Sequence, residues 1–356
     1  MTEKTELLRS LCLAFGPSGC EDNVRELIID EGKKYCSDYA VDNMGNVVFR
    51  FCPPSAVGKL MLSAHMDEVG FMIHTVTEDG YLKFSPLGGM DERVLCGRCV
   101  TVGDEKKKVS GIISSKAIHH QSREERRKTT PVKDMFIDIG AMGAKEAEEL
   151  VSIGDFGTFD SEFYLFGDED APLIKSKALD DRLGCAVMLL AMKKIARGEI
   201  TPNMEISFCF TVREELGLSG AQVVAQRLCP DYAIVLETTA IADIADVAPA
   251  LRVAEVGKGG AISLLDRSTI YDGNFVRFAL DTAEKHDIPV QVKRFVSGGN
   301  DAGHIHKSGK GVKCLALSAP TRYLHSPSCV ASLADFEAIE ALVAAMLNDK
   351  DWERKI

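Results

Sequence analysis

The sequence predicts an α/β protein in which helices flank a mainly parallel sheet and a small, barrel-like β domain interrupts the chain. Short apolar runs alternate with amphipathic helical segments early in the chain and again after residue 164, as in parallel sheets covered on both faces. Between 69 and 163, short β-like runs and turn residues dominate. We therefore expect a discontinuous α/β domain (1–68 and 164–356) with an inserted β domain (69–163).

Hydrophobic periodicity defines the individual elements. In the larger domain, helices are predicted at 5–15, 21–35, 180–196, 219–228, 272–286 and 332–347. Its strands are predicted at 60–64, 204–212, 232–236, 290–295 and 312–317, with a hairpin at 40–51. In the inserted domain, strands are predicted at 70–76, 81–84, 99–102, 109–113 and 136–139, and a helix at 144–150. The highly charged segment 121–133 is expected to be an exposed loop.

Composition narrows the class of function. The formal net charge of −11 disfavours sequence-independent nucleic-acid binding, which depends on Lys and Arg neutralising phosphates. No apolar run approaches the roughly 20 residues of a membrane span, and the charged first residues do not resemble a signal peptide. Eleven cysteines without a repeating framework predict free, mostly buried thiols in the cytoplasm. The lone pair Cys96 and Cys99 is expected to be two ordinary thiols.

Metal-binding residue types follow the predicted strands. In open α/β sheets, ligands bind beyond the carboxyl ends of the strands. Four of the predicted strand ends, and the start of the long helix, supply at least one candidate each: His65, Asp180, Glu214, Glu215, Glu237 and His325. Taken singly, each has an ordinary interpretation; Asp180, for example, could cap its helix. Together, two imidazoles and several carboxylates indicate a mixed nitrogen and oxygen site that suits Zn²⁺, Co²⁺ or Mn²⁺.

The spacing within these motifs has chemical reasons. Asp67 can accept the second N–H of His65, which fixes the tautomer of a metal-binding imidazole. Adjacent carboxylates such as Glu214 and Glu215 can diverge, so that one binds metal and the other acts as general base. Asp180 could bridge two metals about 3.5–4 Å apart, a pair that polarises a carbonyl and lowers the pKa of a bridging water.

The motifs resemble those of the M42 metallopeptidases, also called glutamyl or tetrahedral (TET) aminopeptidases. The resemblance runs nearly end to end. It rests on Gly16-Pro17-Ser18-Gly19-Cys20-Glu21, Ser63-Ala64-His65-Met66-Asp67-Glu68-Val69-Gly70-Phe71, Ile137-Asp138-Ile139-Gly140-Ala141, Lys177-Ala178-Leu179-Asp180-Asp181-Arg182, Arg213-Glu214-Glu215-Leu216-Gly217, Gly298-Gly299-Asn300-Asp301-Ala302 and His325-Ser326-Pro327. It implies a zinc-exopeptidase-type α/β domain, an inserted domain used in subunit assembly, and removal of the N-terminal residue from short peptides.

The resemblance also implies a specific two-metal site, with zinc or cobalt as the metals. One metal would be held by Asp180, Glu215 and His325, and the other by His65, Asp180 and Glu237. Glu214 would be the general base that activates the metal-bridging water, and Asp67 would orient His65. Neither nucleic acid nor membrane is an expected partner. The chain is expected to form homo-oligomers, from dimers through the inserted domain up to dodecamers.

The sequence departs from the family pattern at two positions. Glu237 stands where Asp is usual, and one extra methylene can move the carboxylate by about 1.5 Å. Asn300 replaces the usual Thr, and no role follows from the sequence for Asn300 or Asp301 beyond Asp organising its own turn. Side-chain specificity is not readable; Arg252, Lys258 and Arg322 are candidate pocket cations but are expected to be surface charges.

Three alternative functions stay open at this stage. The first is an endoglucanase-type glycoside hydrolase, since some members of the family have been called endoglucanases, although such enzymes need two carboxyl groups across a sugar ring and usually no metal. The second is a metal-dependent carboxypeptidase or deacylase on the same scaffold. The third is a non-catalytic peptide-binding protein in which the second metal site is weakened at Glu237.

Overall fold

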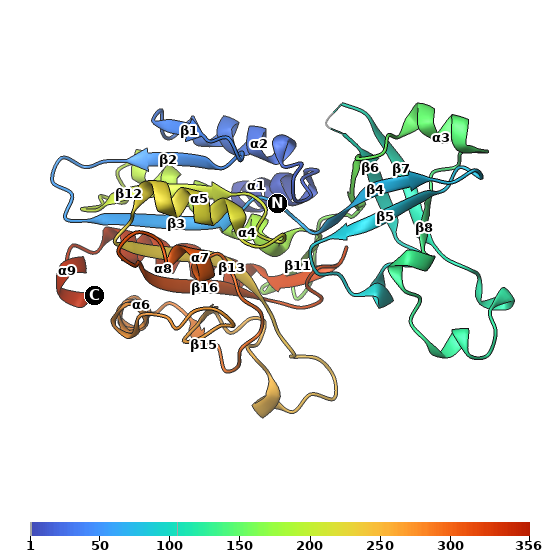
Figure 1. The fold of residues 1–356 in the computed structure, drawn as a ribbon. Helices are drawn as coiled ribbons and strands as arrows, with labels where there is room; N and C mark the ends of the chain where they lie inside the picture. Colours follow the sequence, from blue (N-terminus) through green and yellow to red (C-terminus); the bar gives the residue numbers. More distant parts are fainter. Residues whose placement is uncertain (1, 105) are drawn as a thin grey trace.

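The computed structural model describes residues 2–104 and 106–356, the side chain at 353 excepted. Figure 1 shows a large body built on one sheet and a smaller β body that extends from one end of it. The sheet has eight strands, and the smaller body is a closed barrel of six strands. The predicted fold class, a mainly parallel sheet with helices and an inserted barrel-like β domain, is confirmed.

The central sheet carries four adjacent parallel strands. In spatial order its strands are β1 (Tyr39–Val41), β2 (Val47–Phe51), β12 (Glu205–Thr211), β3 (Lys59–His65), β13 (Tyr232–Ala240), β16 (Lys313–Thr321), β14 (Gly260–Ile262) and β15 (Val290–Val292). Strands β12, β3, β13 and β16 pair in parallel, whereas β2 and β14 flank them in antiparallel orientation. The carboxyl ends of the four parallel strands therefore meet at one edge of the sheet.

Helices cover the sheet because its central strands are apolar along nearly their whole length. They are α1 (Glu3–Leu13), α2 (Asp22–Gly32), α4 (Leu179–Ala196), α5 (Ser219–Leu228), α6 (Gly273–Lys285), α7 (Ala302–Ile305), α8 (Leu333–Asn348) and α9 (Trp352–Lys355). Helix α4 is buried almost all round, since it packs on β3 and β13 and is itself covered by α1 and α8. Helix α5 contacts β12 and α7 and lies in front of the sheet in Figure 1.

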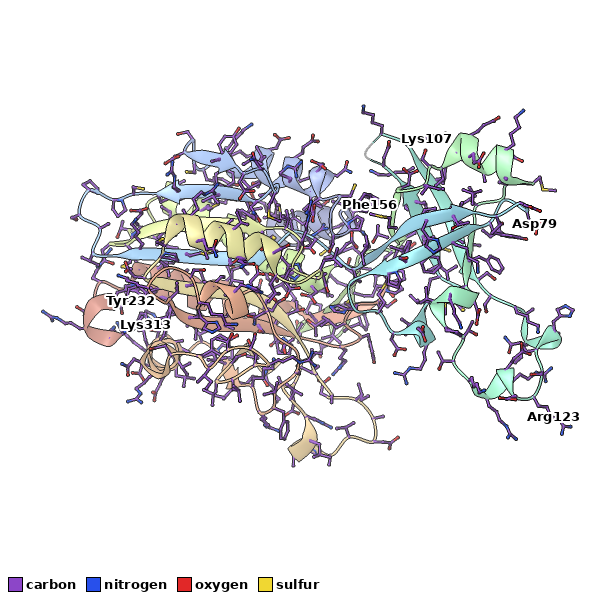
Figure 2. The ribbon with its side chains drawn as sticks, viewed as in Figure 1. Asp79, Lys107, Arg123, Phe156, Tyr232 and Lys313 are labelled. Carbon is purple, nitrogen blue, oxygen red and sulfur yellow. The ribbon has the colours of Figure 1, made fainter. Side chains whose placement is uncertain are left out.

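The barrel has its own apolar core, which includes Phe71, Phe84 and Phe159. Its strands, in order around the barrel, are β4 (Gly70–Val76), β5 (Leu82–Leu87), β8 (Phe136–Asp138), β7 (Lys108–Ser114), β6 (Cys99–Gly103) and β9 (Phe156–Phe159), with α3 (Ala144–Leu150) beside them. The exposed charged segment 121–133 forms only short turns, and Figure 2 shows Arg123 far from the main body. All these strands lie inside the 69–163 insertion predicted from sequence.

A three-stranded antiparallel sheet was not predicted. Its strands are β10 (Tyr164–Gly167), β11 (Pro172–Ser176) and β17 (Cys329–Ser332). These strands are short and mix polar with apolar residues, so they carry little periodic signal. The sheet matters for the site, because β11 ends just before the segment that carries Asp180, and β17 begins just after the loop that carries His325.

Two central strands are longer than predicted. Strand β13 runs on from the predicted end at 236 to Ala240, and β16 from 317 to Thr321. The extra residues are polar or small, but they pair with each other in register, Glu237 with Ser318 and Ala240 with Thr321. Glu237 therefore lies inside a buried strand, and the expectation that it follows the strand end is wrong.

The thiols agree with the sequence prediction. Seven of the eleven cysteines are buried. Cys96 and Cys99 are both exposed free thiols. Within residues 2–104 and 106–356, no helix is both long enough and apolar enough to cross a membrane.

The only tryptophan provides a test of the packing near the C-terminus. Trp352 is fully buried, its ring centroid lies 5.6 Å from Phe275 and 5.0 Å from Phe278, and its Nε1 donates to the Met346 carbonyl at 3.1 Å. Trp352→Ala is expected to lower the free energy of unfolding by about 3–5 kcal/mol. Urea unfolding followed by circular dichroism measures this. The control Ile270→Ala, at an 84% exposed position, should stay within about 0.5 kcal/mol. A loss below about 1 kcal/mol for Trp352→Ala would contradict the packing.

Candidate metal centre

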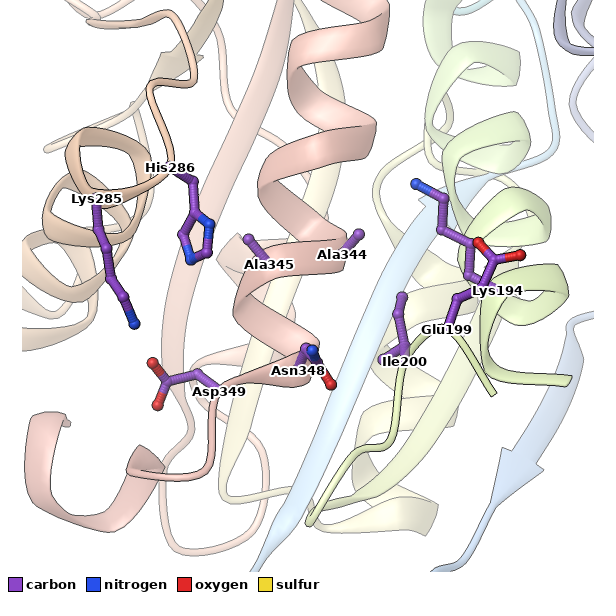
Figure 3. Close-up of a pocket in the computed structure, with 9 residues that line it drawn as sticks. All are labelled: Lys194, Glu199, Ile200, Lys285, His286, Ala344, Ala345, Asn348 and Asp349. Atoms are coloured by element: carbon purple, nitrogen blue, oxygen red, sulfur yellow. The ribbon is translucent and has the colours of Figure 1, made fainter. Parts of the chain in front are cut away.

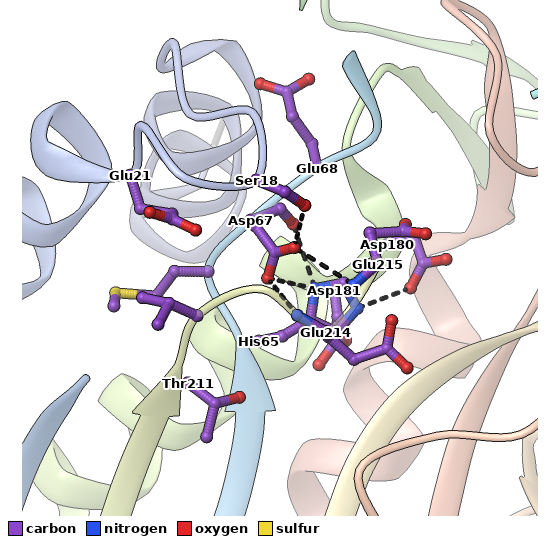
Figure 4. Close-up of polar contacts among 12 residues, drawn as sticks. Ser18, Glu21, His65, Asp67, Glu68, Asp180, Asp181, Thr211, Glu214 and Glu215 are labelled. Atoms are coloured by element: carbon purple, nitrogen blue, oxygen red, sulfur yellow. Dashed lines mark hydrogen bonds and ion pairs between the residues drawn. The ribbon is translucent and has the colours of Figure 1, made fainter. Parts of the chain in front are cut away.

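The candidate ligands converge at the carboxyl edge of the central sheet. His65 is the last residue of β3, and its register partner Thr211 ends β12. Glu237 lies in β13, Asp180 in the first turn of α4, and His325 in the loop between β16 and β17. Figure 4 shows the side chains of His65 and Asp180 turned toward each other. Residues that are far apart in sequence thus reach one small volume.

The two nitrogens of the His65 ring face different partners. Nδ1 lies 3.0 Å from the main-chain oxygen of Asp67 and 3.4 Å from Asp67 Oδ1. Nε2 lies 3.3 Å from Asp180 Oδ1 and 3.6 Å from Glu237 Oε1. Asp67 therefore lies beside the second ring nitrogen of His65, as its spacing predicts, although its main-chain oxygen is the nearer acceptor. With Nδ1 donating to Asp67, Nε2 is the nitrogen available to a metal.

His325 faces the other oxygen of the same carboxylate. Its Nε2 lies 3.3 Å from Asp180 Oδ2 and 3.1 Å from Glu215 Oε1. Its Nδ1 lies 2.5 Å from the main-chain oxygen of Gly89, which follows β5 of the barrel. His325 has a φ of 58°, a backbone conformation that residues other than glycine rarely adopt. The Asp180 carboxylate thus lies between two imidazoles, with one oxygen toward each.

Two overlapping groups of side chains have potential ligand atoms within 4.8 Å of one another: His65, Asp180 and Glu215, and His65, Asp181 and Glu237. The five predicted ligands are thus brought together, with His325 reaching the first group through its contacts with Asp180 and Glu215. The groups differ from the predicted triads in one respect, since Asp181 joins the side of Glu237. Residue type and spacing alone do not tell Asp180 from Asp181, because both lie in the first turn of the helix.

Two buried carboxylate oxygens of this cluster lack a hydrogen-bond partner among the described residues. They are Glu215 Oε1 and Asp181 Oδ2. Glu215 Oε1 lies 3.1 Å from His325 Nε2, but without the angles of a hydrogen bond. A buried polar atom without a partner costs free energy, which a bound cation would offset. The set of imidazoles and carboxylates therefore fits a divalent transition metal such as Zn²⁺ or Co²⁺.

Negative charge exceeds positive charge in this cluster. Burial, together with the charges of Glu237 and Glu215, raises the pKa of Glu214 well above its ordinary value. Burial alone would lower the pKa of His65, but contacts with three carboxylates, first that of Asp180, raise it well above its ordinary value. In both cases neighbouring carboxylates contribute to raising the pKa, and bound cations would reduce this excess of negative charge.

Asp67 has a second role that sequence reasoning missed. Its Oδ1 accepts from the main-chain N–H of Glu214 at 3.0 Å, and its Oδ2 accepts from that of Glu215 at 3.2 Å. Oδ2 also accepts from the hydroxyl of Ser18. Asp67 therefore fixes the segment that carries the predicted general base. The motif that contains Ser18 is visible in the sequence, but spacing alone does not indicate a contact across 49 positions.

Asp180 does not cap its helix. The capping hydrogen bond comes from Asp181, whose Oδ1 accepts from the Gly184 N–H at 3.0 Å. Asp180 and Asp181 both have non-helical backbone angles at the start of α4. The ordinary interpretation of an acidic residue before a helix therefore applies to Asp181, and the Asp180 carboxylate is left facing the two histidines.

Asn300 and Asp301 form buried hydrogen bonds next to the candidate ligands. Asn300 Nδ2 donates to the hydroxyl of Tyr271 at 3.1 Å. Asp301 Oδ2 accepts from the Thr211 hydroxyl at 2.7 Å and lies 3.4 Å from the Ser63 hydroxyl. The expectation that Asp301 organises its own turn is wrong. Its buried side chain instead binds the ends of β12 and β3, the strands that lead to the candidate ligands.

A cavity of about 480 Å³ opens onto the candidate ligands. Its lining comprises Gly89, Asp91, Asp180, Glu214, Glu215, Glu237, Thr238, Ala240, Ser297, Gly298, Gly299, Leu324 and His325. A second cavity, of about 360 Å³, lies beside α4, α6 and α8 and is shown in Figure 3. It is lined by mixed charges such as Lys194 and Asp349, and none of the candidate site residues lines it. A further space beside Asp180, Glu215 and His325 measures only about 10 Å³. The 480 Å³ cavity is therefore the one beside these ligands that has room for a substrate.

The chain is similar to known peptidases over nearly its whole length. Residues 45–342 match the family model described as M42 glutamyl aminopeptidase. A putative aminopeptidase from Acetivibrio thermocellus is 36% identical over 342 residues, which cover 96% of this chain and 98% of that protein. The crystal structure of a TET aminopeptidase from a marine sediment thaumarchaeon has a TM-score of 0.94 and 35% identity, with 99% of this chain and 97% of that chain covered.

The structure of the Pyrococcus horikoshii TET1 peptidase, described as able to assemble into a tetrahedron or a large octahedral shell, has a TM-score of 0.85 and 34% identity. It covers 98% of this chain and 100% of that chain. These matches confirm the predicted resemblance and the prediction of an aminopeptidase-type peptide hydrolase. The chain is a member of the M42 glutamyl aminopeptidase family.

Proposed function

We propose that the chain is a two-metal aminopeptidase that removes the N-terminal residue from short peptides. The observation that carries this proposal is the shared Asp180 carboxylate, whose two oxygens lie 3.3 Å from Nε2 of His65 and 3.3 Å from Nε2 of His325. Such sharing suits a carboxylate between two cations. The ligands lie at the wall of a cavity that is large enough for a peptide end.

Asp180, Glu215 and His325 would hold one metal, and His65, Asp180 and Glu237 the other. Asp181 is a further candidate on the side of Glu237. When bound, two such metals polarise the peptide carbonyl and lower the pKa of the attacking water. The extra methylene of Glu237 does not remove it from the cluster, because its Oε1 lies 3.6 Å from His65 Nε2.

Glu214 is proposed to move the proton during hydrolysis. It lines the cavity, and Asp67 holds its main-chain N–H. As the water oxygen adds to the carbonyl carbon, Glu214 would accept the proton that the water loses. It would then donate that proton to the leaving amine nitrogen as the carbon–nitrogen bond breaks. A buried carboxylate whose pKa is raised is suited to both steps.

The charges around the cavity favour an aminopeptidase over a carboxypeptidase. A carboxypeptidase needs a cation for the terminal carboxylate, and the described lining residues include neither Lys nor Arg. Among the candidate pocket cations, Arg252 pairs with Glu255 at 2.9 Å, Arg322 pairs with Asp243 at 2.7 Å, and Lys258 is exposed. An acidic wall instead suits the free α-amino group of a peptide. A glycoside hydrolase has less support, because it usually needs no metal, whereas Asp180, Glu215 and Glu237 lie within 3.1–3.6 Å of imidazole nitrogens.

We also propose that the chain forms homo-oligomers through the barrel. The barrel exposes large apolar side chains, including Met142 (91% exposed) and Ile153 (69% exposed). One structure that is 34% identical is described as a dodecamer, and the Pyrococcus horikoshii relative as a tetrahedron or an octahedral shell, which supports assemblies up to a dodecamer for this chain. Size-exclusion chromatography with light scattering distinguishes these oligomeric states from a monomer.

The free cysteines support a reducing compartment such as the cytoplasm.

Metal removal should abolish activity reversibly. Protein treated with a chelator and then freed of it by dialysis is expected to lose at least about 99% of its hydrolysis of aminoacyl anilides, because both the polarising cations and the activated water are lost. Addition of Zn²⁺ or Co²⁺ should restore the rate, whereas Ca²⁺ should not, since it prefers oxygen ligands in larger numbers. A stripped protein that keeps its full rate would refute the metal-dependent mechanism.

Glu214→Gln should lower kcat by about 10²–10⁴-fold, because the amide cannot accept the proton of the attacking water. Metal content per chain, measured by mass spectrometry, should stay at the wild-type value, which separates loss of the base from loss of a ligand. Glu284→Gln, on the surface of α6, is the matched control and should leave kcat unchanged. A Glu214→Gln variant with wild-type kcat would exclude Glu214 as the base.

The free amino terminus should be required. Leucyl-anilide is expected to be hydrolysed at least about 100-fold faster than N-acetyl-leucyl-anilide, since acetylation removes the positive charge and adds bulk where the cavity meets the acidic ligands. The comparison uses kcat/KM on the metal-loaded protein. Equal rates on the two substrates would indicate a deacylase or an endopeptidase instead.

A further inference from the structure

We propose that Glu68 is a positioning residue for the metal centre. It would hold the segment of His65 and Asp67 against the segment of Asp180, and thereby keep the metal ligands at the spacing that binds metal tightly. The inference rests on the proposed function, because it concerns the same ligands. It adds a residue that belongs to neither of the ligand groups and does not line the 480 Å³ cavity. Glu68 instead lines a small space of about 10 Å³ on another side of Asp180, Glu215 and His325.

The main chain of Glu68 is fixed to the loop after α1. Its N–H donates to the Gly16 carbonyl at 3.0 Å, and its carbonyl accepts from the Ser18 N–H at 3.2 Å. Ser18 in turn donates its hydroxyl to Asp67. Both the N–H and the carbonyl of Glu68 are therefore hydrogen-bonded to this loop. The same loop orients the Asp67 carboxylate through Ser18.

The side chain of Glu68 binds two other parts of the chain. Oε1 accepts from Lys177 Nζ at 2.6 Å and lies 3.6 Å from a terminal nitrogen of Arg182. Oε2 accepts from the hydroxyl of Thr158, in strand β9 of the barrel, at 2.8 Å. These side chains are at most 4% exposed, so the contacts are shielded from solvent. One carboxylate thus joins the His65 segment, the Asp180 segment and the barrel.

The positions of the cations explain how this contact could control the ligands. Lys177 precedes Asp180 by three residues and Arg182 follows it by two. Arg182 also donates to the carbonyl of Met66, between His65 and Asp67, at 2.5 Å. The ligand segments are therefore clamped on both sides by buried charge. Loss of the Glu68 charge would leave Lys177 buried without its counter-charge, and the two segments would be free to separate.

The chain provides a matched control. Glu340, in α8, is a buried glutamate (3% exposed) that also pairs with two cations, Lys4 and Lys194. It contacts none of the candidate ligands. Glu340→Gln should therefore reproduce the general cost of removing a buried negative charge without any effect on the metal centre.

The test is isothermal titration of chelator-stripped protein with Zn²⁺. Glu68→Gln keeps the size and the acceptor for Thr158 but removes the charge, and it is expected to weaken the binding of Zn²⁺ by about tenfold or more. Glu340→Gln should bind Zn²⁺ within about twofold of the wild type. At saturating metal, Glu68→Gln should regain the wild-type KM. Wild-type affinity in Glu68→Gln, or equal weakening in Glu340→Gln, would overturn the proposal.

A double variant keeps the proposal testable if Glu68→Gln folds poorly. Glu68→Gln with Lys177→Met removes both charges, so its melting temperature should recover relative to Glu68→Gln alone. Affinity for Zn²⁺ should stay weakened, because the clamp is still absent. Recovery of affinity together with stability would mean that the pair is merely structural. If the wild-type protein binds no Zn²⁺, the proposed function fails as well. If the wild type binds two Zn²⁺ and Glu68→Gln binds them with the same affinity, only this inference is contradicted.

Discussion

The carboxylate of Asp180 presents one oxygen to His65 and the other to His325, and the surrounding structure is arranged so that this sharing can occur. His65 ends a central strand, and His325 lies in a loop between two sheets. Parallel pairing of β3, β12, β13 and β16 brings their carboxyl ends to one edge, where the start of α4 can reach both histidines. A shift of any of these segments would separate the imidazoles from their common partner.

The sharing is supported by layers of buried polar contacts. Asp67 binds the ring of His65 and also the main chain of Glu214 and Glu215. Behind the sheet edge, Asp301 binds the hydroxyl of Thr211. Because buried polar groups are costly unless they are paired, these contacts define one arrangement of the loops. The ligand oxygens that remain without partners lie in the same cluster, which is where a cation would be most stabilising.

Much of the fold could be predicted because its central strands and long helices are strongly periodic. Helix α4, for example, begins within one residue of its predicted start. The sheet of β10, β11 and β17 could not be predicted, since its strands are short and β17 joins β11 across more than 150 positions. The residue types of the site were also readable, because acidic residues and histidines follow apolar strands. The distances between these side chains could not be predicted from the sequence, since tertiary contacts decide which oxygen of Asp180 or Asp181 faces which ring.

The departure at Glu237 illustrates the same limit. The sequence indicates a longer side chain at a ligand position, but it does not indicate that β13 continues past this residue and carries it inside a buried strand. The anomalous diffraction of crystals grown with Zn²⁺, recorded at the zinc edge, tests the central claim most directly. The account predicts two anomalous peaks per chain, one on each side of the Asp180 carboxylate. A single peak, or peaks elsewhere in the chain, would contradict it.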